Sequence, residues 1–208
     1  MKLTWIVFFL VVLSSCSQGT YDVALIKTKY GDIEFMLHEQ TPRHKKNFMM
    51  LAKSQFYDGT YFHRLIPNFM IQGGDPYSKT QAGEVGTGGT GYLLPAEIDS
   101  TLSPKRGAVV AARLSDEQNP YRESNGSQFY IVQNENRASH LNGKNTIFGQ
   151  VISGWEVLDR INNLPTDMNS KPVEKILMAI SVKKMKKEYV DKKLSEATLQ
   201  ISQAQVRK

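Results

Sequence analysis

Cysteine is almost absent from this sequence of 208 residues, in which Cys16 is the only one. A single cysteine excludes a framework held together by disulfide bonds. The four histidines are scattered, with no H-E-x-x-H pattern and no cysteine partner, so no metal site is expected. The sequence also has no G-x-S-x-G and no pair of carboxylates within an apolar motif. It therefore lacks the residue patterns of nucleophilic and metal-dependent catalysis.

Long hydrophobic runs are absent after residue 13. The one such run, residues 3–13, follows the charged start Met1-Lys2 and is too short to span a bilayer as a helix. A short basic start followed by an apolar run of this length is typical of a secretory signal peptide.

Cys16 stands where cleavage of that peptide is expected. The sequence LSSC at residues 13–16 resembles the lipobox of bacterial lipoproteins, in which the cysteine is diacylated on sulfur and becomes the new N-terminus. The resemblance predicts a lipoprotein signal peptide at residues 1–15 and a lipidated cysteine with a tether at residues 16–22. Acyl chains would anchor the protein to a membrane without making it span. The expected location is the bacterial cell envelope, on the outer-membrane or periplasmic side rather than the cytoplasmic side. The alternative is an ordinary signal peptide followed by a chance cysteine.

Charge of one sign is scarce in the body of the chain, although the formal net charge is +6. Residues 183–208 hold eight Lys or Arg and three Asp or Glu, whereas residues 16–182 hold seventeen of each sign. The neutral body has no basic patch interleaved with aromatic residues, so nucleic acid is not expected as a partner. Residues 185–208 contain no Gly or Pro and have apolar residues at roughly helical spacing, which predicts a basic helical tail. Its lysines could lie on an anionic membrane surface, or the helix could be a solvated end.

Short strand-like runs separated by turns make up the body. Residues 23–26 and 33–37 flank a glycine-containing turn and predict a hairpin. Thr41 and Pro42 then supply an N-cap and a first-turn proline for a helix that runs to about residue 52. A second short helix is expected at residues 156–162, and further strands at residues 61–66, 69–72, 107–113, 128–132, 146–151 and 173–182. This order predicts a mainly β domain over residues 23–184, folded as a closed antiparallel barrel with helices covering its ends.

The glycine-rich segment GTGGTG at residues 86–91 formally matches G-x-G-x-x-G. A dinucleotide site of this kind needs a strand before the glycines and a helix after them. Neither flank qualifies here, so a flexible or ligand-flanking loop is expected instead.

Residues 62–76, FHRLIPNFMIQGGDP, place Arg64 among apolar residues on two short strands around a Pro-Asn turn. Such an arginine either snorkels over apolar surface or stands at the edge of an apolar pocket. A pocket with one arginine and Gln72 suits chemistry that breaks no bond, and prolyl cis/trans isomerisation fits. A guanidinium aimed at the prolyl nitrogen would stabilise the twisted amide more than either planar form.

Together with NGSQFYI, GTGG and LNGKNTIFGQV, this stretch closely resembles the cyclophilin-type peptidyl-prolyl isomerases, in the same order from Val23 to Val182. The resemblance implies an eight-stranded antiparallel barrel capped by two α-helices, without a cofactor. Arg64, Gln72 and Phe69 match the family's catalytic positions. The positions that match substrate contacts are His63, Met70, Ala112, Arg113, Gln128, Tyr130, His140, Leu141 and Asn145.

Four of these positions depart from the family pattern. His140 stands where cyclosporin-sensitive members have tryptophan, and Asn145 replaces a histidine that contacts substrate. Arg113 replaces an asparagine, and Tyr130 stands where the family usually has phenylalanine. These departures bear on cyclosporin affinity and peptide preference, while Arg64 and its pocket are intact. The loop at residues 115–124 is longer than in compact members, and we expect it to shape substrate access.

These features together predict an exported, membrane-anchored monomer that isomerises X-Pro bonds in cell-envelope polypeptides. One alternative is a lipoprotein that binds or chaperones proline segments with little turnover. Another is a structural lipoprotein whose tail docks a partner.

Overall fold

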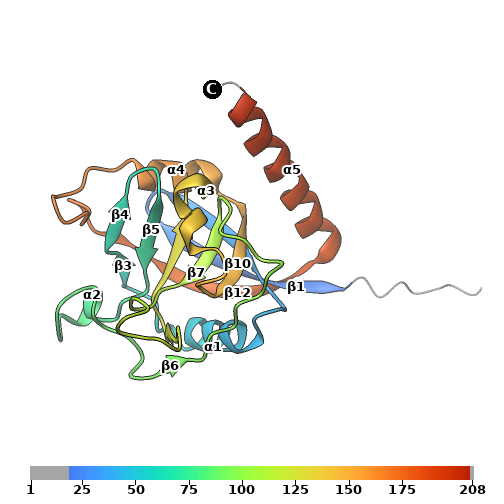
Figure 1. Ribbon diagram of the computed structural model, residues 1–208. Helices are drawn as coiled ribbons and strands as arrows, with labels where there is room; N and C mark the ends of the chain where they lie inside the picture. Colours follow the sequence, from blue (N-terminus) through green and yellow to red (C-terminus); the bar gives the residue numbers. More distant parts are fainter. Residues whose placement is uncertain (1–18, 207–208) are drawn as a thin grey trace, which may run out of the picture.

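An antiparallel sheet of eight strands forms the centre of the computed structural model, which describes residues 19–206. The strand order is β12-β1-β2-β10-β7-β9-β5-β4, and every neighbouring pair runs antiparallel (Figure 1). In that order the strands are Ala179–Lys186, Thr20–Thr28, Gly31–Leu37, Ile147–Ser153, Ala108–Ala111, Phe129–Val132, Met70–Gly73 and Arg64–Ile66.

Two short ladders lie outside this sheet. β3 (Tyr61–Phe62) pairs with β11 (Ile176–Leu177), and β6 (Leu93–Leu94) pairs with β8 (Ser124–Asn125). Because β3 leads into β4 and β11 leads into β12, the first ladder connects the two edges of the large sheet. The predicted mainly β fold with eight antiparallel strands is confirmed. No β4–β12 ladder is among the pairings of the described residues, and the closed barrel stays a prediction.

Two amphipathic helices cover opposite ends of the sheet (Figure 1). α1 (Pro42–Lys53) buries Phe48 and Leu51, and α4 (Trp155–Asn162) buries Leu158 and Ile161, all within one continuous apolar core. Shorter pieces are α2 (Tyr77–Thr80), α3 (Glu135–Ala138) and the 3₁₀ turn η1 (Ser139–Leu141).

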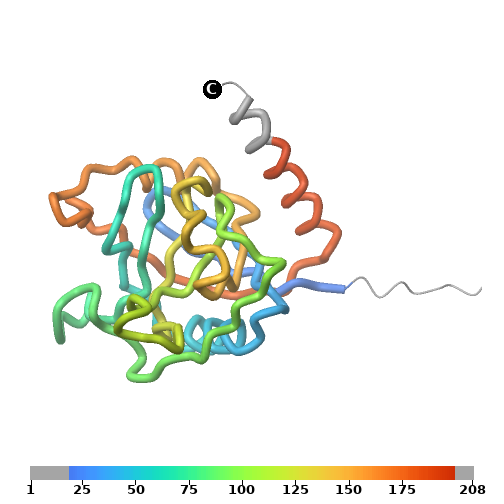
Figure 2. Tube along the Cα trace, in the orientation of Figure 1, coloured from blue at the N-terminus to red at the C-terminus, as the bar shows by residue number. Residues whose placement is uncertain are grey.

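The C-terminal helix α5 (Lys187–Val206) starts beside the N-terminal strand, where the Lys187 N–H donates to the Gly19 carbonyl at 2.9 Å (Figure 2). Its first turns pack Val190 against Val23 and Ile152, and the rest of the helix leads away from the sheet (Figure 1). The predicted tail helix is therefore confirmed, although β12 extends to Lys186 and delays its start. Among the described helices, none has both the length and the apolar character needed to cross a bilayer.

The remaining elements follow the sequence pattern with local differences. The hairpin and both predicted helices are present. The run at residues 61–66 is divided at His63 into β3 and β4, and the run at residues 173–182 is divided at Met178 into β11 and β12. These divisions let β3 and β11 leave the large sheet and pair with each other.

The start of α1 differs from the expectation in its capping group. Thr41 is buried, and its side chain makes no capping hydrogen bond. The Glu97 carboxylate instead accepts the N–H groups of Arg43 and His44 at 3.0 and 2.9 Å. The prediction of Thr41 as the capping side chain was wrong, because a carboxylate from a distant loop satisfies the free helix donors.

Candidate active site

One row of side chains crosses the outer face of the sheet on four neighbouring strands. Arg64 of β4 lies opposite Gln72 of β5, Gln72 lies opposite Tyr130 of β9, and Tyr130 lies opposite Val110 of β7. Successive residues of a strand point to opposite faces. The chain neighbours Leu65, Ile71, Ile131 and Val109 accordingly belong to the main core on the other face.

An apolar cluster separate from the main core lies on this outer face. Its buried members include Met70, Ala112 and Tyr130, and Phe69 and Leu141 pack against it while partly exposed. The structure thus brings together Phe69, which matches a catalytic position, and four of the positions that match substrate contacts. The His140 ring adds an edge, with its centroid 5.9 Å from that of Phe69 and the planes tilted by 39°.

The turn between β4 and β5 sets the position of Phe69. Asn68 has a left-handed backbone with φ of 55°, which asparagine tolerates. The buried side chain of Asn162 on α4 accepts the Asn68 N–H at 2.9 Å and donates to the Ile66 carbonyl at 3.1 Å. The Gln133 N–H donates to the Phe69 carbonyl at 2.7 Å. Asn162 therefore holds this turn, and no feature of its sequence context pointed to that role.

A chain of polar side chains runs beside the apolar cluster. The Arg64 Nη1 lies 3.5 Å from Oε1 of Gln72, at the limit of a hydrogen bond, and the Arg64 side chain is exposed. Gln72 Nε2 donates to Gln128 Oε1 at 2.9 Å. The guanidinium is thus oriented by Gln72 on one side and is otherwise exposed to solvent.

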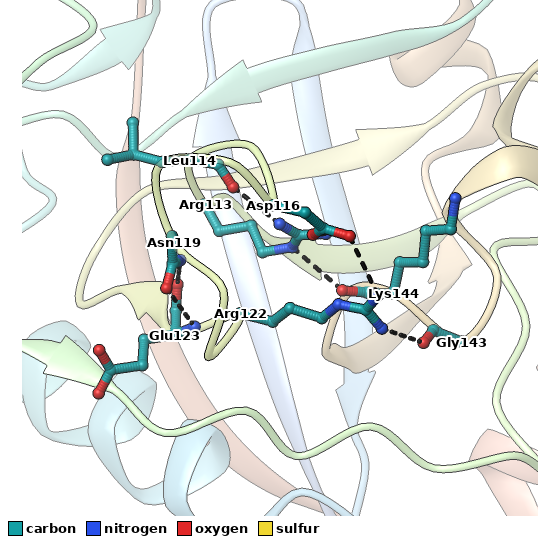
Figure 3. Close-up of polar contacts among 8 residues, drawn as sticks. All are labelled: Arg113, Leu114, Asp116, Asn119, Arg122, Glu123, Gly143 and Lys144. Carbon is teal, nitrogen blue, oxygen red and sulfur yellow. Dashed lines mark hydrogen bonds and ion pairs between the residues drawn. The ribbon is translucent and has the colours of Figure 1, made fainter.

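Arg113 is placed at the groove, but its side chain is engaged within the protein (Figure 3). Nε donates to the Lys144 carbonyl at 3.0 Å, Nη1 donates to the Leu114 carbonyl at 2.8 Å, and Nη2 pairs with Asp116 at 2.7 Å. Only 8% of the side chain is exposed. Its predicted contact with substrate is therefore limited to its backbone, because the guanidinium holds two loops together.

The loop at residues 115–124 is fixed by a second arginine in the same cluster (Figure 3). Arg122 pairs with Asp116 at 3.0 Å and donates to the Gly143 carbonyl at 3.2 Å. A cavity of about 650 Å³ lies between this loop and the glycine-rich segment, lined in part by Gln72, Tyr121 and Gln128. The expectation that this loop borders the groove agrees with its position.

The other predicted contact residues are buried. Ala112 uses its backbone N–H and carbonyl within the protein, to Gln128 and Asn125, so only its methyl group faces the apolar cluster. Asn145 is buried at the end of the loop that Arg113 holds. Burial of Tyr130 raises the pKa of its hydroxyl, which has no hydrogen-bond partner within the described part of the chain.

His63 is buried behind Arg64 rather than exposed in the groove. Its pKa is lowered to about 4, mainly by burial; the charge of Asp75 opposes this shift and the charge of Arg64 adds to it. Burial likewise lowers the pKa of His38 to about 4. Both imidazoles are therefore neutral in the folded protein at neutral pH, and His63 is not a proton donor there.

These two histidines predict acid sensitivity. Their pKa values are about 4 when folded and 6.5 when exposed. Their stabilising effect is therefore complete above pH 6.5 and is lost as the pH falls toward 4. Each histidine is expected to contribute about 3 kcal/mol to this loss. Thermal melting from pH 7.5 to 4 should show a falling Tm, and His63→Gln should remove part of the slope. The matched control is His140→Gln at the exposed histidine, and a Tm independent of pH would contradict the assignment.

Comparison with known proteins agrees with the fold and with the geometry of this site. The family model "Cyclophilin type peptidyl-prolyl cis-trans isomerase/CLD" matches residues 23–183. The peptidyl-prolyl cis-trans isomerase ppi1 of Schizosaccharomyces pombe is 38% identical over 160 residues, which cover 76% of this chain and 97% of that protein. CYP65 of Arabidopsis thaliana is 38% identical over 151 residues, which cover 72% of this chain and 24% of that protein. The chain thus spans about a quarter of the length of some relatives and nearly all of others.

A solved structure shares both fold and sequence. The Cryptosporidium parvum cyclophilin type isomerase, crystallised in the presence of the dipeptide Ala-Pro, superposes with a TM-score of 0.69 and is 36% identical. The match covers 77% of this chain and 98% of that chain. With the family model covering most of the described domain, this chain belongs to the cyclophilin-type peptidyl-prolyl cis-trans isomerase family.

Proposed function

We propose that the protein is a peptidyl-prolyl cis-trans isomerase in which Arg64 stabilises the twisted amide of a bound X-Pro bond. The observation that carries the proposal is the row Arg64–Gln72–Tyr130 beside the apolar cluster around Met70 and Phe69. The use of Ala-Pro with a solved relative supports a proline-containing peptide as substrate.

The reaction needs no nucleophile. Rotation about the X-Pro bond is opposed by amide resonance, with a barrier of about 18–20 kcal/mol. Twisting localises a lone pair on the prolyl nitrogen, and a guanidinium donor placed there binds the twisted state more tightly than the planar states. The apolar cluster would hold the pyrrolidine ring and exclude water that favours the planar amide. Gln72 would keep the guanidinium turned toward that nitrogen.

The test is a proline-peptide isomerisation assay with the full chain in mild detergent. Acceleration of cis-to-trans conversion supports an enzyme. Binding of the peptide without acceleration would favour the alternative of a proline-segment binding or chaperone protein with little turnover.

The cellular setting is part of the proposal. A lipid on Cys16 would anchor the protein in a bacterial cell envelope, where exported polypeptides would be its substrates. Cys16 lies outside the described residues, but β1 begins only four residues later, at Thr20. Thr20 pairs with Lys186, and Lys187 Nζ lies 5.1 Å from the Tyr21 ring centre. So short a tether would bring these lysines to anionic headgroups.

We expect Cys16→Ser to release the protein from the membrane fraction into the soluble fraction. One myristoyl-length chain binds a membrane only marginally, whereas two chains anchor stably, so loss of both acyl groups should have a large effect. Fractionation and immunoblotting of expressing bacteria measure it, with Ser17→Ala as the matched control. A Cys16→Ser protein that stays with the membrane would contradict the lipid anchor.

Two structural details belong to the same proposal. The sheet would close into a barrel, and the β3–β11 ladder supports this because its strands lead into the two edge strands β4 and β12. The protein would act as a monomer, and the position of Arg64, Gln72 and the apolar cluster within one chain means that the site needs no second copy.

A further inference from the structure

The glycine-rich segment wraps the carboxylate of Asp75, whose side chain is completely buried. Asp75 Oδ1 accepts the Tyr77 N–H at 2.7 Å, and Oδ2 accepts the N–H groups of Gly86 and Gly88 at 2.5 and 3.1 Å. Gly86 has a φ of +109°, and a Cβ on Gly88 would overlap the carboxylate. The glycines therefore allow the backbone to enclose this side chain.

Asp75 and its loop fix the orientation of the Gln128 side chain, which is 4% exposed. Gln128 Nε2 lies 3.3 Å from Asp75 Oδ2 and 3.0 and 2.8 Å from the carbonyls of Gly86 and Gly88. All three neighbours accept hydrogen bonds and none donates. Amide orientation follows from such partners. The nitrogen of Gln128 must therefore face Asp75, and its oxygen must face the other way.

The orientation of Gln128 determines that of Gln72, and Gln72 in turn determines which atom faces Arg64. Gln128 Oε1 can only accept, so Gln72 must turn Nε2 toward it, at 2.9 Å. Gln72 Oε1 is then the atom that faces Arg64 Nη1, at 3.5 Å. If Gln128 were reversed, Gln72 would reverse as well and present an NH₂ group to the guanidinium. Two donors would then face each other, and the guanidinium would lose its partner.

We propose that Asp75 is a positioning residue for Arg64, acting through Gln128 and Gln72, with the segment at residues 86–88 as its holder. Asp75 itself touches no substrate. The kinetic part of this inference rests on the proposed function, whereas the orientation of Arg64 can be measured without it.

Asparagine cannot replace the carboxylate at this position. One oxygen of Asp75 faces Tyr77 and the other faces Gly86, Gly88 and Gln128, and all of these partners donate. An amide would turn its NH₂ group against one of the two sets. Asp75→Asn is therefore expected to loosen the segment at residues 86–88, whose two carbonyls hold the Gln128 amide, and so to let Gln128 rotate with little change in side-chain size at residue 75.

A double-mutant cycle tests this relay, the series of contacts from Asp75 through Gln128 and Gln72 to Arg64. The full chain in mild detergent is compared as wild type, Asp75→Asn, Gln72→Ala and the double variant, by kcat/KM on a proline peptide. Asp75→Asn is expected to lower kcat/KM about tenfold, and to lower it no further when Gln72 is already alanine. Equal losses in both backgrounds would mean that Asp75 acts only on the fold, and would overturn the proposal.

The second measurement does not depend on catalysis. The ¹⁵N NMR resonance of the Arg64 Nε–H group is expected to shift in Asp75→Asn as it does in Gln72→Ala. Asp99→Asn is the control, because Asp99 likewise accepts loop donors, from Thr101, and has no contact with Gln128. An unchanged resonance in Asp75→Asn would contradict the relay even if the wild type proves inactive.

Gln128→Met keeps the test decisive if Asp75→Asn fails to fold. Asp75 then retains its three backbone donors, while the link to Gln72 is removed. The same shift of the Arg64 resonance and a similar loss of kcat/KM are expected. A wild-type resonance and rate in Gln128→Met would overturn the relay, whereas an inactive wild type with the expected shifts would overturn only the proposed function.

Discussion

Arg64→Ala is expected to lower kcat/KM for an X-Pro peptide by about 10²–10³-fold, the usual cost of removing one preorganised donor from a transition state. Arg64 supplies the cationic donor of the Arg64–Gln72–Tyr130 row, which lies on the same face of the sheet as the apolar cluster. The loss should fall on kcat more than on peptide binding, because the apolar cluster remains. A coupled proline-peptide assay and a direct binding titration separate the two.

Arg64→Lys refines the same prediction. Lysine keeps the charge but lacks the planar fork that Gln72 orients, so an intermediate activity is expected. The matched control is Arg43→Ala, at an exposed arginine on α1. Full activity in Arg64→Ala would remove Arg64 from its assigned role and return it to a snorkelling surface charge.

Phe48→Ala is expected to lower the free energy of unfolding by about 3–5 kcal/mol, the range for truncating a buried aromatic side chain. Phe48 of α1 is 2% exposed. Its ring centre lies 5.4 Å from Phe35, 5.1 Å from Tyr57, 5.8 Å from Phe129 and 5.5 Å from Phe148. Alanine would leave a cavity bordered by four rings that belong to separate elements.

Urea unfolding followed by circular dichroism measures this loss. Met50→Ala is the control on the same helix, because Met50 is 53% exposed and should cost little. Equal midpoints for the two variants would mean that α1 does not hold the core together as described.

Sequence patterns predicted the elements whose determinants are local. The hairpin of β1 and β2 follows from two apolar runs around a glycine turn, and α1 follows from an apolar periodicity after Pro42. The cap of α1 did not follow, because Glu97 comes from a loop more than fifty residues further along the chain. Propensity at Thr41 was outweighed by this long-range carboxylate.

The candidate site likewise has features that follow from local sequence and features that depend on distant residues. Alternation along FHRLIPNFMIQ places Arg64 and Gln72 on one face, so their proximity could be predicted. The engagement of the Arg113 side chain could not, since its partner carbonyl at Lys144 lies in another loop. Asp75 lies inside the recognised motif, yet its role depends on Gly86, Gly88 and Gln128 being folded around it. Asn162 has no local pattern at all.

The pairing of β1 with β12 has a consequence for the timing of folding. The two strands come from opposite ends of the described chain, and β12 joins an edge of β1 that β2 leaves uncovered. Contacts so distant in sequence form late, because loop-closure entropy opposes them. During synthesis the β1–β2 hairpin would emerge first and carry an unpaired edge until the last strand had been made. Such an edge can template pairing with other chains, so completion of the chain, rather than local structure, would end the aggregation-prone phase of this protein.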